Sequence, residues 1–376
     1  MDTRPRLSAR MAQTQLSRRG FVGLAALTAT ALAGCGPLGL GSAAGSSVTP
    51  AATHPPAPIP PGGKISTANA SAIKQLAAFT PNSQSIRGVA WSGDGRLLAA
   101  GTEGDIYLWD MTNPAFRTIW RGHTNEVYGM AWSPDGKLLA SASLDGSVRL
   151  WAYGQRQAVR VLRDTVAISP ISVSWSPDSA RVACGTLGGN TIIWNAATGE
   201  RLAKWSGPPM VGRGKGGRNP FAVWGVSWSP DGHTLATTRY DDLIQLWNVA
   251  SGHATVLQKT DSQPNTIAWA PTGDTFATTD DDGKVQIWRA ETGKIVTTLF
   301  DHSEAGWGYG LAWSPDAQLI TATRETGLVQ VWSVADGKQR FAAPAHYTSA
   351  WAAAWSPDNL RFATGGDDGK VCVWGV

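Results

Sequence analysis

The stretch AWSPDGKLLASASLDGSVRLW, residues 131–151, is the clearest copy of a pattern that recurs along the chain. Runs such as KLLASA and SVRLW alternate apolar and polar residues, which is the period of a half-buried β-strand. The PDG and DG steps between the runs are typical of tight hairpin turns. The stretch therefore predicts three antiparallel strands joined by short turns.

The pattern occurs seven times, at spacings of 41 to 44 residues with one spacing of 53. Each copy opens and closes on a tryptophan; the opening residues are Trp91, Trp132, Trp175, Trp228, Trp269, Trp313 and Trp355, and the closing ones are Trp109, Trp151, Trp194, Trp247, Trp288, Trp332 and Trp374. One such unit cannot bury its own faces, whereas a ring of units buries each sheet against the next. We expect an all-β, seven-bladed β-propeller of four-stranded blades.

The spacing, the SPDG turn and the closing tryptophan resemble WD-40 repeats over about residues 72–376. In that family a His, a Ser or Thr, an Asp and a Trp form a hydrogen-bonded tetrad within a blade. The resemblance implies two complete tetrads: His123, Ser141, Asp145 and Trp151 in the second copy, and His346, Thr364, Asp368 and Trp374 in the last. The third and sixth copies lack the Asp.

The seventh copy ends on its third strand, at residues 374–376, which would leave a sheet edge open to aggregation. Residues 72–79, AIKQLAAF, align with AFRTIWRG at 115–122, the outer strand that precedes the second copy. We therefore predict that 72–79 form the outer strand of the last blade and close the ring, as in similar proteins.

The N-terminal stretch SRRGFVGLAALTATALAGC, residues 17–35, has the features of an export signal. Arg18 and Arg19 match most of the twin-arginine pattern, and the apolar run 21–34 is shorter than the ~20 residues that span a bilayer. Residues 32–35 resemble a lipobox, in which Cys35 becomes acylated. We predict a signal peptide at 1–34, a Pro/Gly/Ser/Ala-rich tether at 35–71, and a protein anchored through lipid to the outer face of a bacterial cytoplasmic membrane. Sec export, or cleavage elsewhere without lipidation, remains open.

The charge of the chain does not indicate a nucleic-acid partner. The formal net charge is +4, but residues 1–34 contain five arginines against Asp2, a net charge of +4, so the remainder is neutral. A strongly basic surface is what nucleic-acid binding requires. We expect no nucleic-acid partner and a monomeric propeller.

Sequence motifs of catalysis or metal binding are absent, and we predict no catalytic residue, cofactor or metal. The chain contains neither HExxH nor a G-x-S-x-G elbow. DDDG at 280–283 occupies a repeat turn and lacks the spacing of a calcium loop. The 206–221 loop matches G-x-G-x-x-G without a following helix, so it predicts no phosphate site, although Arg213, Lys215 and Arg218 could contact an acidic partner. Cys184 and Cys372 lie in distant blades, and we expect both thiols to be free and buried.

One column of the repeat carries the candidate binding site. Four residues before each opening tryptophan stand Arg87, Tyr128, Ile171, Trp224, Asn265, Tyr309 and Trp351, with Trp307 nearby. The resemblance implies that this position opens onto the top face near the central channel. Aromatic residues around a concave mouth are typical of binding hot spots. We predict a non-catalytic protein-interaction scaffold; the alternatives are a glycan or small-ligand receptor on the same face, a mere plug of the channel, and, third, a propeller hydrolase. For a binding surface, replacing Trp224 and Trp351 by Ala should abolish binding with little loss of melting temperature.

Overall fold

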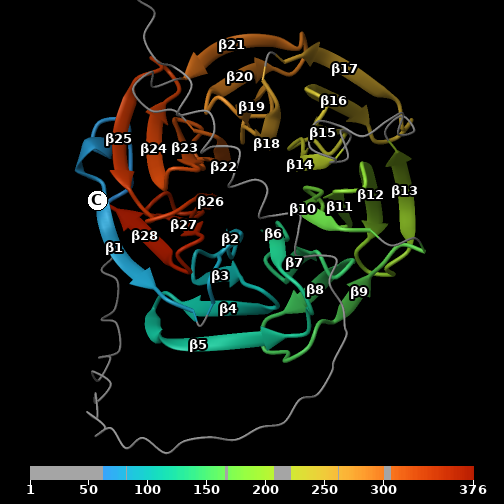
Figure 1. Cartoon of the computed structure of the whole chain (residues 1–376), viewed down its shortest axis with the longest axis horizontal. Helices are drawn as coiled ribbons and strands as arrows, with labels where there is room; N and C mark the ends of the chain where they lie inside the picture. Colours follow the sequence, from blue (N-terminus) through green and yellow to red (C-terminus); the bar gives the residue numbers. More distant parts are fainter. Residues whose placement is uncertain (1–61, 82, 166–167, 207–221, 261, 300–305) are drawn as a thin grey trace, which may run out of the picture. The chain divides into compact units, whose positions relative to one another are not determined.

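The computed structural model describes residues 62–81, 83–165, 168–206, 222–260, 262–299 and 306–376. These residues form seven four-stranded antiparallel sheets arranged around a central axis (Figure 1). The prediction of an all-β, seven-bladed propeller is confirmed. The part of the chain that the structure describes contains no helix long and apolar enough to cross a membrane.

Blades one to three follow the chain in order, each from its inner to its outer strand. Blade one consists of β2 (Gly88–Trp91), β3 (Leu97–Gly101), β4 (Asp105–Asp110) and β5 (Asn113–Arg121). Blade two consists of β6 (Val127–Trp132), β7 (Leu138–Ser143), β8 (Ser147–Ala152) and β9 (Arg160–Leu162). Blade three consists of β10 (Pro170–Trp175), β11 (Arg181–Thr186), β12 (Asn190–Asn195) and β13 (Arg201–Ser206).

Blades four to six have the same internal order. Blade four consists of β14 (Val223–Trp228), β15 (Thr234–Arg239), β16 (Leu243–Asn248) and β17 (Ala254–Lys259). Blade five consists of β18 (Pro264–Trp269), β19 (Thr275–Asp280), β20 (Val285–Arg289) and β21 (Lys294–Leu299). Blade six consists of β22 (Gly308–Trp313), β23 (Leu319–Arg324), β24 (Leu328–Ser333) and β25 (Gln339–Pro344).

Blade seven joins the two ends of the described chain. Its strands are β26 (Ala350–Trp355), β27 (Phe362–Gly366), β28 (Val371–Gly375) and, as outer strand, β1 (Lys74–Phe79). β1 pairs antiparallel with β28, from Lys74 opposite Gly375 to Phe79 opposite Val371. The prediction that the segment 72–79 closes the ring is confirmed, with the strand beginning at Lys74.

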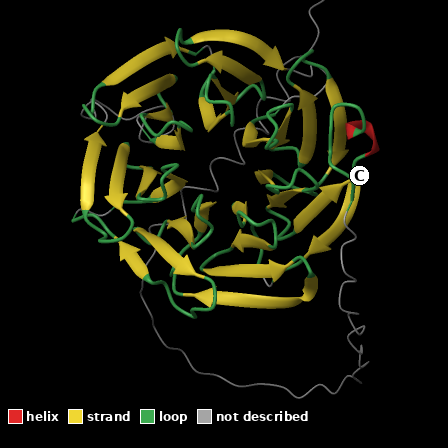
Figure 2. Ribbon diagram, turned by 180° about the vertical axis from the view of Figure 1, so that it is seen from behind, coloured by secondary structure: helices red, strands yellow, loops and turns green. Residues whose placement is uncertain are grey.

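The residues just before β1 are packed as well. Ile65 is fully buried, its N–H donates to Asn359 O at 2.8 Å, and Asn359 Nδ2 donates back to Ile65 O at 2.9 Å. The short 3₁₀ turn η1 (Ala70–Ala72) lies at the outer edge of the ring beside the chain end (Figure 2). We predicted that the tether runs to residue 71, but 62–71 belong to the packed unit because Ile65 and Ala70 insert into the core around Trp374.

The hydrophobic core lies between neighbouring blades and not inside any one of them. One cluster joins Val371 and Val373 of blade seven to Trp91 and Trp109 of blade one. Another joins Ala140 and Leu150 of blade two to Trp175 and Trp194 of blade three. Burial between sheets explains why the repeat is stable only as a ring.

Candidate functional site

Residues of all seven inner strands line one cavity of about 250 Å³. All seven residues of the predicted column contribute to it: Arg87, Tyr128, Ile171, Trp224, Asn265, Tyr309 and Trp351. We call this cavity the mouth. Because every blade supplies one column residue, the mouth lies on the axis of the ring.

β-Bulges explain why the column residues reach the mouth. In blades two to seven, the pairing of the inner strand with the next strand shifts register at the column position. In blade four, for example, Val223 pairs with Arg239 and Gly225 with Thr238, which leaves Trp224 as the extra residue. A bulge leaves one residue outside the ladder and re-aims its side chain. Each inner strand therefore turns one side chain toward the axis.

On one side of the mouth, the column residues form a bonded cluster. Arg87 Nη2 lies 3.2 Å from Asp367 Oδ1, and the Arg87 side chain is only 6% exposed. The guanidinium also lies 4.0 Å from the centre of the Trp351 ring, a cation–π contact. Trp351 Nε1 donates to Asp367 Oδ2 at 2.8 Å, and its ring stacks on Tyr309 at 3.9 Å. We call Arg87, Tyr309, Trp351 and Asp367 the arginine cluster.

The opposite side of the mouth is less constrained. The Trp224 ring makes one tilted aromatic contact, with Tyr240 at 6.5 Å, and its buried indole N–H has no hydrogen-bond partner among the described residues. Asn265 is held differently, since its amide donates to Asp281 Oδ1 and to Gly308 O, both at 3.0 Å. Ile171 is buried and apolar. Within the described part of the chain, Trp224 is therefore less constrained than Trp351.

Some predicted site residues lie elsewhere. Trp307 packs edge-on against Tyr309 at 6.3 Å, next to the mouth and not in its lining. The basic residues Arg213, Lys215 and Arg218, and the export and lipidation residues Arg18, Arg19 and Cys35, lie outside the described residues.

Sequence reasoning missed Asp367, which bonds to both Arg87 and Trp351. The sequence feature that could have revealed Asp367 is the pair of adjacent acidic residues, Asp367 and Asp368. Only Asp368 occupies the tetrad position, so a second carboxylate one residue earlier is left for another partner.

Both expected tetrads have the hydrogen bonds that the resemblance implies. In blade two, His123 Nδ1 lies 2.8 Å from Asp145 Oδ2 and His123 Nε2 lies 2.7 Å from Ser141 Oγ. Trp151 Nε1 donates to the same Ser141 oxygen at 2.8 Å. The tetrad thus ties the loop before β6 to β7, to the turn between β7 and β8, and to β8.

The tetrad of blade seven repeats this geometry. His346 lies 2.8 Å from Asp368 Oδ1 and 3.0 Å from Thr364 Oγ1, and Trp374 Nε1 donates to Thr364 at 3.1 Å. Burial lowers the pKa of His123 and of His346, against the opposing effect of the hydrogen bonds that the two rings donate to Asp145 and Asp368. Both histidines are therefore neutral at pH 7.

Blades three and six lack this arrangement. At the Ser/Thr position they carry Cys184 and Ala322, and the indole N–H groups of Trp194 and Trp332 have no hydrogen-bond partner among the described residues. Cys184 and Cys372 are both free and buried, as predicted. Burial raises the pKa of Cys372 to about 12, so this thiol is unreactive.

Groups that could perform chemistry are scarce at the mouth. Among the described residues that line it there is no histidine, cysteine or carboxylate, and burial raises the pKa of Tyr128 well above its ordinary value. Across the described part of the chain, no cluster of three or more His, Cys, Asp or Glu side chains is placed to hold a metal ion. The acidic turn at 280–283 is structural, since Asp280 Oδ1 accepts the N–H groups of Asp282 and Lys284.

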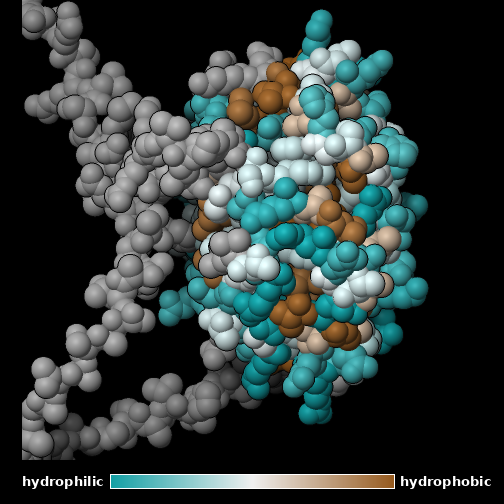
Figure 3. All heavy atoms as spheres, turned by 90° about the vertical axis from the view of Figure 1, so that its right-hand side faces the viewer, coloured by the Kyte–Doolittle hydropathy of each residue, from teal (hydrophilic) through white to brown (hydrophobic). Residues whose placement is uncertain are grey.

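The outer rim offers a weaker binding surface than the mouth. Val161, Leu202 and Val256, on β9, β13 and β17, are 44–48% exposed. Figure 3 views this side of the ring, and its apolar patches are separated by hydrophilic atoms. Apolar side chains scattered in this way are normal for soluble proteins and mark no interface.

Comparisons with known proteins agree with this architecture. The chain is 29% identical to polyadenylation factor subunit 2 of Gibberella zeae over 114 residues, which are 30% of this chain and 19% of that relative. The match thus spans about a fifth of the relative's length. The family model for the WD domain, G-beta repeat, matches residues 73–110, 115–152, 215–248, 251–289 and 337–375, together half of the chain. The chain belongs to the WD40 repeat family.

Proposed function

We propose that this protein is a non-catalytic scaffold that binds a protein partner through the mouth of the propeller. Membership of the WD40 family supports a protein-interaction role. The observation that carries the proposal is the asymmetric mouth, in which Trp224 is partly exposed and weakly held while its neighbours are fixed. A rigid frame around one available aromatic ring is the arrangement of an interaction hot spot.

The size of the mouth favours a protein partner over a small ligand. Pockets for small molecules usually enclose about 300–1,000 Å³, and the mouth encloses about 250 Å³. A shallow cavity of this kind accepts one or two side chains from a larger surface. We therefore rank a glycan or small-ligand receptor at the mouth second, and turnover at the mouth third. The role named for the Gibberella zeae relative is not transferred, because the match covers too little of either chain.

Affinity capture from host membranes tests the proposed interaction. Wild-type protein is compared with Trp224→Ala, which removes the available ring, and with Tyr153→Ala, which removes an exposed ring after β8, at the other end of the blade from the mouth. A protein recovered by the wild type and by Tyr153→Ala, and lost with Trp224→Ala, supports the scaffold. Equal recovery by all three proteins contradicts binding at the mouth.

The proposal includes export and lipid anchoring, supported by the sequence of residues 17–35. Metabolic labelling with an alkyne-bearing fatty acid should label the wild type and not Cys35→Ser, which should leave the membrane fraction. Replacing Arg18 and Arg19 by Lys should leave the protein in the cytoplasm if the twin-arginine route exports it. An unlabelled wild type that stays in the membrane fraction contradicts the lipid anchor.

A further inference from the structure

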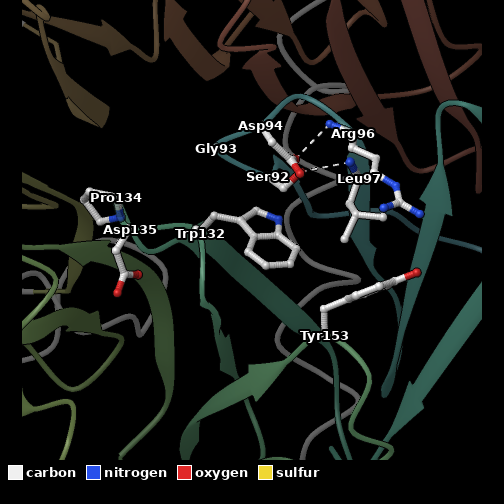
Figure 4. Close-up of a pocket in the computed structure, with 10 residues that line it drawn as sticks. Ser92, Gly93, Asp94, Arg96, Leu97, Trp132, Pro134, Asp135 and Tyr153 are labelled. Atoms are coloured by element: carbon white, nitrogen blue, oxygen red, sulfur yellow. Dashed lines mark hydrogen bonds between the residues drawn. The ribbon is translucent and has the colours of Figure 1, made fainter.

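A second cavity lies between blades one and two, at the end of β2 remote from the mouth. It encloses about 420 Å³ and is lined by Ser92, Gly93, Asp94, Arg96, Leu97, Trp132, Pro134, Asp135, Gly136 and Tyr153. Arg96 precedes β3, Trp132 ends β6 and Tyr153 follows β8. Figure 4 shows these side chains among the residues that line the cavity. We call it the interblade pocket.

The interblade pocket coincides with a departure from the repeat. Six of the seven turns after the inner strands carry proline at the second position, whereas the first turn is SGDG, with Gly93. Elsewhere that proline packs against the turn of the next blade: a Cβ placed on Gly232 would lie 3.1 Å from Pro177 Cγ, and one on Gly273 would lie 3.7 Å from Pro230. The equivalent Cβ on Gly136, facing Gly93, would meet no atom within 4 Å. The missing proline ring therefore leaves the pocket open.

The lining of the interblade pocket combines aromatic rings with balanced charges. Trp132 is partly exposed and Tyr153 is 45% exposed, so both rings offer apolar surface. Arg96 forms an ion pair with Asp110 at 2.6 Å. Asp94 accepts hydrogen bonds from the Ser92 hydroxyl and from the Arg96 N–H. Asp135 pairs with Lys137 at 3.1 Å.

These features indicate which chemical class of ligand fits the interblade pocket. The charged groups already have partners, so a charged ligand would lose hydration without a new counter-ion. A hydroxyl can accept from Arg96 and donate to Asp94 or Asp135, which an amine or a carboxylate cannot do alone. The apolar face of a sugar ring suits the faces of Trp132 and Tyr153. The volume lies within the usual range of about 300–1,000 Å³ for small-molecule sites.

We propose that the interblade pocket binds a neutral saccharide of one or two rings, against Trp132 and Tyr153. This site is independent of the mouth and of the partner proposed for it. Gly93→Pro provides the sharpest test, because six sister turns accommodate proline at this position. The turn is closed by the Gly95 N–H, which donates to Ser92 O at 2.8 Å, and not by the Gly93 N–H.

Saturation-transfer NMR and calorimetry would measure binding of glucose, galactose, mannose, N-acetylglucosamine, maltose and cellobiose at up to about 20 mM, where millimolar complexes are populated. We expect at least one sugar to bind the wild type, and its affinity to fall about tenfold or more in Gly93→Pro and in Tyr153→Ala. Gly93→Pro should unfold at the same or a higher temperature, since proline restricts the unfolded chain. Should it fail to fold, Tyr153→Ala decides.

Trp224→Ala separates the two sites, because it alters the mouth and leaves the interblade pocket intact. Sugar binding retained by Trp224→Ala and weakened by the two pocket variants supports the proposal. The proposal is overturned if none of the six sugars binds, if sugar binding is unchanged in Tyr153→Ala, or if Trp224→Ala abolishes it. The same measurements with choline and with acetate test for a charged ligand, and binding of either in place of the sugars also overturns the proposal.

Discussion

The sector of blades seven, one and two differs from the sector of blades three and four in how its polar side chains are used. The first sector holds both tetrads and, apart from Tyr309 of blade six, the arginine cluster. In the second, blade three has Cys184 at the Ser/Thr position of the tetrad, and the column residue Trp224 of blade four has a tilted contact with Tyr240 in place of a bonded cluster. Column residues that look equivalent in the sequence therefore differ in their contacts: Trp351 is held by Arg87, Asp367 and Tyr309, whereas Trp224 is the residue that we propose for partner binding.

Asp367→Ala should have the largest effect, because it removes the carboxylate that contacts both Arg87 and Trp351. Removing one partner of a buried ion pair is strongly destabilising; since Asp367 is 27% exposed, we expect a loss of about 2–4 kcal/mol in the free energy of unfolding. Urea denaturation measures it. The matched control is Asp231→Ala in blade four, whose carboxylate accepts hydrogen bonds from the Ser229 hydroxyl and the His233 N–H, and whose loss should be about 1 kcal/mol. Equal losses would show that the two sectors do not differ.

Trp351→Ala should destabilise the fold more than Trp224→Ala. The Trp351 ring stacks on Tyr309 and lies under Arg87, whereas the Trp224 ring makes one tilted contact. We expect a loss of about 2–3 kcal/mol for Trp351→Ala, and a loss at least about 1 kcal/mol smaller for Trp224→Ala. Thermal unfolding compares them. Equal melting temperatures of the two variants would contradict a structural role for Trp351 and would favour the prediction from sequence, in which Trp351 is a binding residue.

Acid should loosen blades two and seven before blade three. The pKa of His123 and of His346 lies below the ordinary value of 6.5 in the folded protein, mainly because of burial. The unfolded chain therefore binds more protons just below pH 6.5, and the stability that the tetrads contribute is complete above that pH and falls as the pH is lowered. Hydrogen exchange of the backbone amides at pH 7.5 and at pH 5 measures the loss of protection separately for each blade.

The tetrad aspartate Asp145 should affect the stability of blade two at a lower pH than the histidine does. Burial opposes ionisation of Asp145, but hydrogen bonds from His123 and Ser147 outweigh it and hold the pKa well below the ordinary value of 3.8. Its contribution is therefore lost only as the pH falls below that value. Blade three, without histidine or aspartate at these positions, is the internal control. Equal loss of protection in all blades at pH 5 would contradict a tetrad origin.

Cys184→Thr should have the smallest effect and the opposite sign. A threonine hydroxyl there would accept the Trp194 indole N–H, as Thr237 does for Trp247 at 3.1 Å. One such hydrogen bond contributes about 0.5–1.5 kcal/mol. Ala322→Ser in blade six, opposite Trp332, is a parallel test. A lower melting temperature for both variants would show that the hydroxyl does not fit these blades.

The column of the candidate site could be predicted from sequence because its residue stands four positions before each opening tryptophan, and the resemblance to WD-40 repeats implied that this position faces the channel. Which residues of the column are held by other side chains could not be predicted from the sequence. Arg87 and Asp367 stand 280 residues apart, and nothing in the repeat period links them. The packing of Ile65 was also missed, because a single buried residue in a Pro- and Gly-rich segment has no periodicity to detect.

The sequence by itself determined the seven blades and their strands, since alternation and turn residues act within about 40 residues of chain. The tetrads of blades two and seven were implied by the resemblance to WD-40 repeats, and the structure shows their hydrogen bonds. Only the tertiary structure decided which mouth residues are held, that residues 62–71 join the packed unit, and that Gly93 leaves a pocket beside blade two. Each of these depends on contacts between blades, where the partner of a side chain is set by closure of the ring and not by its neighbours in sequence.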